Sequence, residues 1–91
     1  MAYEVEIRIP AAQSLKDRRQ VVRSLLDGAR GRFAVSAAEV GGQDTWQRAT
    51  LGFAAVASEA RIAEETIDAI DRFLWSRPEI EVLDAEITWL T

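Results

Sequence analysis

The hydrophobic residues of this chain follow two periods, and the order of those periods constrains the fold more than any other feature. Four segments show the two-residue alternation or short apolar run of a strand, and two show the helical repeat of about 3.6 residues. The strands are predicted at residues 2–9, 33–40, 49–57 and 80–90, and the helices at residues 14–30 and 59–76. The connections are short, so we expect a single domain, residues 1–91.

The order strand–helix–strand–strand–helix–strand predicts a ferredoxin-like fold, an α+β sandwich of two layers. In this βαββαβ arrangement four antiparallel strands form the sheet, and the crossover rule places both helices on one of its faces. The segment 49–57 is apolar throughout, which predicts a central strand buried on both faces. Ser58 is predicted to cap the second helix.

The first helix is the strongest, and residues 14–33 carry six of the eleven basic side chains. Ser14 and Asp17 form an S-x-x-D capping pattern at its start. Two glycines, Gly28 and Gly31, predict that it ends near residue 30.

Two stripes run along this helix when its residues are placed about 100° apart. The apolar stripe contains Leu15, Val22, Leu25, Leu26, Ala29 and Phe33, and the polar stripe contains Lys16, Arg19, Arg23, Asp27 and Arg30. The polar stripe is either a solvated face or a binding surface, and the sequence leaves both open. Arg18 lies at the edge of the apolar stripe, so we expect it to find a partner in the hairpin at residues 41–48.

The net charge of −4 is unevenly distributed. Residues 1–33 carry seven basic and four acidic side chains, whereas residues 34–91 carry four basic and eleven acidic ones. The first helix could therefore attract a polyanion that the rest of the chain repels.

The chain contains no cysteine and no histidine. This excludes disulfides, thiolate nucleophiles and the commonest general base and metal ligand. No catalytic motif is present, so we expect a protein that is not an enzyme and has no cofactor. No apolar run has the length of a membrane span and no signal peptide is recognisable, so we expect a cytoplasmic protein.

The predicted topology brings basic and aromatic side chains to one rim of the sandwich, where the first helix begins and the 41–48 hairpin turns. The rim is expected to collect Lys16, Arg18, Arg19, Trp46, Arg48, Trp75 and Arg77. Cations with exposed rings suit unpaired nucleic acid, because charge binds phosphate and rings stack on bases. The predicted RNA- or anion-binding residues are Lys16, Arg18, Arg19, Arg23, Trp46 and Arg48. The alternative for Trp46 is a plug at the open end of the sandwich, with Arg48 paired to Asp44.

The open face of the sheet is a poor RNA platform. The segment 51–56 faintly echoes an RNA-binding pattern but lacks its basic residue and its final aromatic. Four carboxylates are predicted on that face, from Glu4, Glu6, Asp84 and Glu86, and they would repel phosphate. If the third strand also places apolar residues on this face, the face is better suited to dimerisation. The strand carboxylates could also hold a divalent cation, but their spacing matches no known site.

Three stretches identify a family resemblance: RIPAAQSLKDRR, FAVSAAEVGGQDTWQRATLG and RPEIEVLDAEITWL. They resemble the small bacterial YlxP-like proteins of unknown function over nearly the whole chain. The resemblance implies a ferredoxin-like fold. It also implies a gene often found among genes for translation initiation and ribosome maturation.

We therefore expect a non-enzymatic RNA- or ribosome-associated factor that binds through the start of the first helix and the 41–48 loop. The alternative is a homo-oligomeric protein-interaction or ligand-sensing module, assembled through the sheet face or a sheet edge.

Overall fold

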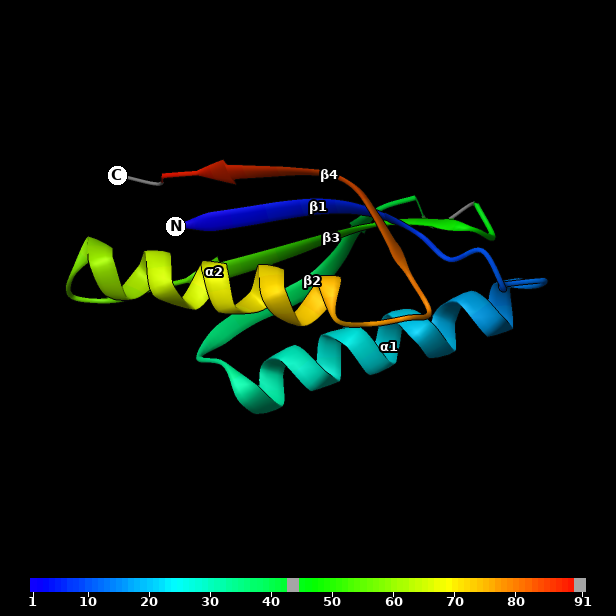
Figure 1. Ribbon diagram of the computed structural model, residues 1–91, viewed down its shortest axis with the longest axis horizontal. Coiled ribbons are helices and arrows are strands. Elements are labelled where there is room, and N and C mark those ends of the chain that lie inside the picture. The colour runs from blue at the N-terminus through cyan, green and yellow to red at the C-terminus, as the bar shows by residue number, and fades with distance from the viewer. Residues whose placement is uncertain (43–44, 90–91) are drawn as a thin grey trace.

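The computed structural model describes residues 1–42 and 45–89 and has the predicted order of elements. The elements are β1 (Ala2–Arg8), α1 (Leu15–Arg32), β2 (Val35–Gly41), β3 (Arg48–Ala55), α2 (Ala60–Trp75) and β4 (Glu81–Thr88). The four strands form one sheet in the order β2-β3-β1-β4, and every neighbouring pair is antiparallel. Both helices lie on one side of this sheet (Figure 1). The predicted ferredoxin-like fold is thus confirmed.

The core lies between the helices and the helix-facing sides of the two central strands. The helix-facing residues of β1, Tyr3, Val5 and Ile7, are buried, and so are Leu51 and Phe53 of β3. They pack against the apolar stripes of the helices, whose buried members are Val22, Leu25, Leu26 and Ala29 of α1 and Ala63, Ile67, Ile70, Phe73 and Leu74 of α2. Burial of these side chains is the main driving force for folding.

The start of α1 has the predicted cap. Ser14 Oγ accepts a hydrogen bond from the backbone N–H of Asp17 at 3.1 Å, and the Asp17 carboxylate accepts one from the N–H of Gln13 at 3.0 Å. The predicted end near residue 30 is wrong, since α1 continues to Arg32 and the N–H of Phe33 bonds the carbonyl of Ala29.

Gly28 is a packing residue rather than a helix terminator. A Cβ atom at this position would lie 2.9 Å from Cζ of Phe73, so the missing side chain lets α1 approach α2 closely. A Cβ atom at Gly31 would meet nothing within 4 Å. Only one of the two helical glycines therefore has a contact that requires it.

Two further predictions differ from the structure. The N-cap of α2 is Glu59, which makes no side-chain capping hydrogen bond, so the predicted cap at Ser58 is wrong. The segment of β3 is buried on one face only: Gly52 and Ala54 are half-buried on the side without helices. The segment 49–57 is apolar because its residues on the open face are small. No second layer of the structure covers that face in the described part of the chain.

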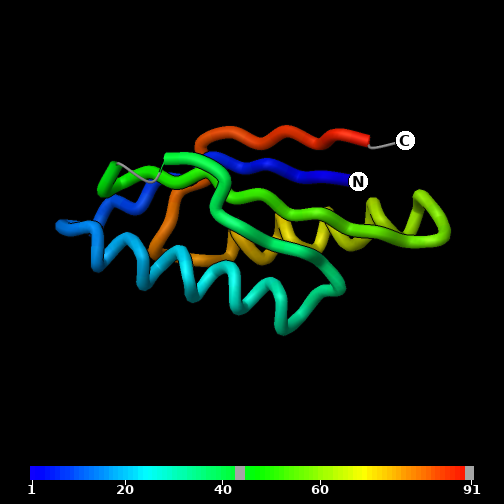
Figure 2. Tube along the Cα trace, turned by 180° about the vertical axis from the view of Figure 1, so that it is seen from behind, coloured from blue at the N-terminus to red at the C-terminus, as the bar shows by residue number. Residues whose placement is uncertain are grey.

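The helical layer is displaced toward β2 and leaves β4 uncovered. Neither helix overlies β4 in Figure 1, and in the reverse view of Figure 2 this strand again lies at the edge away from α1. Every residue of β4 is exposed except Val82, which is half-buried. Apart from Val82, which packs against the core, this edge strand is exposed on both of its faces.

The two glycines of α1 give a matched pair of stability tests. Gly31→Ala should stabilise the protein by about 0.5–1 kcal/mol, because alanine has the higher helix propensity and the position is open. Gly28→Ala should instead destabilise it by about 1–3 kcal/mol, since its Cβ meets the Phe73 ring. Urea denaturation of both variants would measure this, and equal shifts in the two would contradict the packing role of Gly28.

Candidate functional site

Arg18 is a core residue. Its side chain is only 2% exposed and lies between α1 and the β2–β3 hairpin. Its guanidinium donates to the carbonyl of Arg48 at 2.9 Å, to the carbonyl of Gly42 at 2.8 Å and to the Glu39 carboxylate. The expected partner in the hairpin is confirmed. The predicted RNA contact of Arg18 is not supported by this geometry, because its donors face the protein interior.

Glu39 is not among the partners that the sequence predicts for Arg18. The two-residue alternation of β2 nevertheless places Glu39 on the helix-facing side of the sheet. Ala37 is buried on the helix-facing side, and Glu39 follows two residues later on the same side. A carboxylate in phase with a buried alanine indicates a charge that faces the interior beside a helix.

Five cations of α1 are exposed, and three of them, Lys16, Arg19 and Arg23, lie in its N-terminal half. They lie three and four residues apart, so they share one stripe of the helix. None of these three takes part in an ion pair among the described residues, and neither do Arg32, which lies over the Phe73 ring, and Arg72. The paired arginines are Arg8, Arg18, Arg30, Arg48, Arg61 and Arg77. The acidic residue of this stripe, Asp27, pairs with Arg30 instead.

A shallow hollow continues this stripe along α1. It is lined by Arg19, Val22, Arg23, Leu26, Asp27 and Arg30. Arg30 lies at its far end, where it pairs with Asp27 at 3.2 Å and donates to the carbonyl of Ala37 in β2 at 2.5 Å. The N-terminal part of the stripe therefore carries the free positive charge.

Trp46 is 55% exposed, which does not fit the plug interpretation. Its loop is held beside the start of α1 by the next residue, Gln47. The carbonyl of Gln47 accepts from the N–H of Ile9 at 2.7 Å, and its side-chain amide donates to the carbonyl of Pro10 at 3.1 Å. The exposed indole thus belongs to a loop whose next residue, Gln47, is bonded to the link between β1 and α1.

Arg48 lies on the other face of the sheet. Its guanidinium donates to Glu6 at 2.9 Å, so the open face neutralises this charge. The alternative partner, Asp44, lies outside the described residues. Arg77 also leaves the predicted rim, since it bonds Ser24 in the middle of α1 at 3.2 Å. The structure therefore separates the predicted set and keeps Lys16, Arg19 and Arg23 together.

The backbone N–H groups at the start of α1 are partly used by the cap. Ser14 and Asp17 accept two of the local N–H groups, and the Asp17 carboxylate adds a negative charge there. An anion would therefore meet the side-chain stripe more favourably than the helix end.

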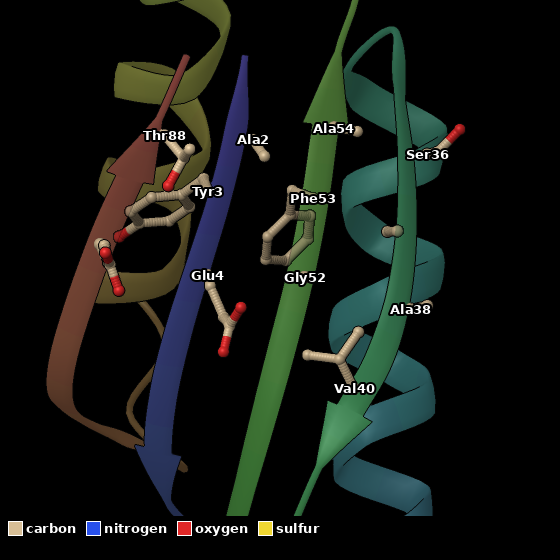
Figure 3. A pocket seen from close by; sticks show the side chains of 12 residues that line it. Ala2, Tyr3, Glu4, Ser36, Ala38, Val40, Gly52, Phe53, Ala54 and Thr88 are labelled. Atoms are coloured by element: carbon tan, nitrogen blue, oxygen red, sulfur yellow. The ribbon is translucent and has the colours of Figure 1, made fainter. Parts of the chain in front are cut away.

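The open face has an apolar trough with an acidic side (Figure 3). Its small residues Ala2, Ala38, Gly52 and Ala54 lie beside Val40, and the hollow measures about 320 Å³. A neighbouring hollow is lined by Glu4, Glu6, Thr50, Asp84, Ala85 and Glu86. The predicted carboxylate cluster is present, and it opposes phosphate binding on this face. Within residues 1–42 and 45–89, no group of three or more potential ligand side chains is arranged to hold a metal ion.

Within residues 1–42 and 45–89, the pKa values of Tyr3 and Glu79 are shifted, and both shifts have structural causes. Burial, together with the 2.5 Å hydrogen bond to Asp71, raises the pKa of Tyr3 well above its usual range. The hydrogen bond from Arg77 lowers the pKa of Glu79. Neither residue belongs to the basic stripe.

The comparisons with known proteins agree with this description. The sequence matches the family described as "Protein of unknown function (DUF503)" over residues 1–87. The chain belongs to the DUF503 family. It is also 40% identical over 86 residues to "Uncharacterized protein YlxP" of Bacillus subtilis (strain 168), covering 94% of each sequence. The YlxP-like resemblance is therefore confirmed. In the described part of this DUF503 protein, no helix has the length and apolarity needed to cross a bilayer.

The buried ion pair gives a direct test of the role of Arg18. Arg18→Met should destabilise the protein by about 3–5 kcal/mol, because it removes the donor of the Glu39 carboxylate and of the Arg48 carbonyl, while the Gly42 carbonyl keeps the N–H of Thr45. Arg19→Met, the matched change at the exposed neighbour, should stay within about 0.5 kcal/mol. Thermal and urea denaturation would measure both, and comparable stability of the two variants would contradict a structural role for Arg18.

Proposed function

We propose that the protein is a non-enzymatic RNA-binding factor associated with the ribosome or its maturation. The RNA backbone binds along the N-terminal half of α1, through Lys16, Arg19 and Arg23. The observation that carries the proposal is the grouping of three exposed cations, none in an ion pair among the described residues, on one stripe of α1, although the sequence has fifteen acidic residues against eleven basic ones.

The physical reason is that exposed cations bind phosphate best when no carboxylate competes for them. Each contact releases counterions from the nucleic acid, which makes binding favourable at low salt. Lys16 and Arg23 lie about 10 Å apart along the helix axis, at about 1.5 Å per residue. This distance corresponds to about three nucleotides of a strand that rises about 3.4 Å per nucleotide.

Trp46 adds an exposed ring beside the beginning of this helix. An indole can stack on an unpaired base, which favours single-stranded RNA or a loop over a regular duplex. The acidic open face limits contact to the helical side of the protein. The genes that often surround those of YlxP-like proteins make ribosomal RNA the first polyanion to test.

The charge stripe gives the first test of this proposal. Replacing Lys16, Arg19 and Arg23 together by Gln should weaken binding to a ribosomal RNA fragment. The slope of log K against log salt should fall by about 2, because each lost contact with a single strand contributes about 0.7. Fluorescence polarisation over a salt series would measure the slope.

The control variant replaces Arg8, Arg61 and Arg72 by Gln. It removes the same number of positive charges, three, but takes them from β1 and α2 instead of α1. This variant should keep most of the affinity. Equal weakening in both triple variants would mean that net charge alone governs binding. No binding of the unmodified protein at low salt would reject the proposed function.

The exposed indole gives the second test. Trp46→Ala should weaken binding to single-stranded RNA by about 1–3 kcal/mol and leave binding to a regular duplex unchanged, because only unpaired bases can stack on the ring. Trp75→Ala is the control, since Trp75 is 65% exposed but lies on α2. Equal losses for single strands and duplexes would contradict stacking.

A further inference from the structure

The most unusual surface of the molecule follows β4. Ala85, Ile87 and Trp89 lie on its helix-facing side, yet Ala85 is exposed, Ile87 is 50% exposed and Trp89 is 46% exposed. Their partners in β1 are buried: Tyr3 pairs with Ile87, and Val5 pairs with Ala85. Trp89 borders a hollow beside the first residues of α2, Ala60 and Ala63, but the helices leave the strip largely exposed. An exposed apolar strip of this kind indicates a missing partner.

Trp75, the last residue of α2, is another exposed aromatic side chain. Asp71 bonds Tyr3, which is the neighbour of Ile87 in the sheet. Trp75 lies one turn after Asp71, on the same side of α2, and is 65% exposed. We call Trp75, Ala85, Ile87 and Trp89 the β4 surface.

The outer edge of β4 also has backbone groups without partners in the sheet. The hydrogen bonds between Ile9 and Gln47 and between Met1 and Ala55 show that the odd-numbered residues of β1 bond β3. The even-numbered residues of β1 therefore bond β4, through Asp84, Glu86 and Thr88. The N–H and C=O groups of Ala85 and Ile87 consequently point outward, and only the exposed Asp84 carboxylate, at 2.9 Å, occupies the N–H of Ala85.

The opposite edge of the sheet is blocked. Arg30 donates to the outward carbonyl of Ala37 in β2, and Arg18 holds the side chain of Glu39 on the same strand. Such side chains prevent another strand from pairing with an edge. Of the two edge strands, β4 is therefore the one whose outward backbone groups are accessible to another strand.

We propose that the protein forms a two-fold symmetric dimer in which β4 pairs antiparallel with β4 of a second copy, centred on Ile87. This inference does not depend on the proposed RNA binding. The partner is a second copy of the chain, because β4 is complementary to itself when two copies run antiparallel in this register. This complementarity concerns the charges and the side-chain sizes that face each other.

Near the middle of the exposed strip, the two copies of β4 can pair in three registers, centred on Ala85, Glu86 or Ile87. These registers differ in whether carboxylates of the two copies face each other. A centre at Ala85 places Asp84 opposite Glu86 of the second copy, and a centre at Glu86 places two Glu86 side chains opposite each other. Like charges directly opposite are unfavourable. A centre at Ile87 places Glu86 opposite Thr88, the large Trp89 opposite the small Ala85, and Ile87 opposite itself. Only this register opposes no two carboxylates.

The dimer would continue the sheet across the two-fold axis. Ile87 and Trp89 of both copies would fill the space beside the two α2 helices, on the side that is now exposed. The α1 helices would lie at the far edges (Figure 1), so the basic stripes would remain free. The interface is small, and we therefore expect a dimer that dissociates on dilution.

A cysteine cross-link tests the register, because the natural chain contains no cysteine. Directly opposite residues of antiparallel strands have Cα atoms about 4.5–5.5 Å apart, which suits a disulfide. Ile87→Cys should therefore give a disulfide-linked dimer under mild oxidation. Glu86→Cys should link more slowly, since the two Glu86 positions are diagonal in this register, and the exposed Gln20→Cys on α1 should link no faster than random collision allows.

Faster linking of Glu86→Cys than of Ile87→Cys would overturn the proposed register. Linking of Ile87→Cys no faster than that of Gln20→Cys would overturn the dimer.

Analytical ultracentrifugation tests the association itself. The unmodified protein should show a dimer that grows with concentration and with added salt, because salt screens the repulsion between two chains of net charge −4. Ile87→Glu should be monomeric, with an unchanged circular dichroism spectrum because the residue is half exposed. Ile62→Glu, at an isoleucine of α2 that is 40% exposed, should dimerise as the unmodified protein does.

A monomer at every concentration and salt level would overturn the proposal, and so would dissociation of Ile62→Glu to the same extent as Ile87→Glu. The result is separable from RNA binding, because added salt should strengthen the dimer and weaken the RNA complex. A failed RNA assay would leave the cross-linking result unaffected.

Discussion

The buried guanidinium of Arg18 is the interaction on which the arrangement of this protein depends. It joins α1 to both strands of the β2–β3 hairpin through two backbone carbonyls and the Glu39 carboxylate. An arginine suits this position because its planar fork can satisfy several acceptors at once. These contacts offset the desolvation cost of burying the guanidinium charge. They also hold the hairpin in a fixed position beside the start of α1.

This contact also fixes which surfaces are available. With α1 held beside β2, the helical layer covers β2, β3 and β1 and leaves β4 in solvent (Figure 1). The same placement puts Arg30 across the β2 edge. One edge of the sheet is therefore closed by arginines, while the other carries exposed apolar side chains. The basic stripe lies on α1, whereas a cluster of four carboxylates, Glu4, Glu6, Asp84 and Glu86, lies on the open face.

The sequence by itself determined the elements, their order and the cap of α1. These features depend on neighbours within a few residues: the alternation of β1, the repeat of α1, and the hydroxyl of Ser14 three residues before the N–H of Asp17. The βαββαβ order then left few possible topologies, and the observed strand order is the usual one. The exposed stripe of Lys16, Arg19 and Arg23 was likewise readable from helical periodicity.

Only the tertiary structure decided where the remaining charges go and which apolar residues stay exposed. Sequence spacing could group Arg18 with Arg19, but it could not show that one is enclosed by a hairpin and the other faces solvent. From the sequence, Gly28 is expected to mark the end of the helix. In the structure it lies inside α1, where the Phe73 ring packs against it. The alternation of β4 predicted a buried face, whereas Ile87 remains half exposed. In each case the deciding contact joins residues far apart in the chain, and local periodicity carries no information about how the layers are displaced.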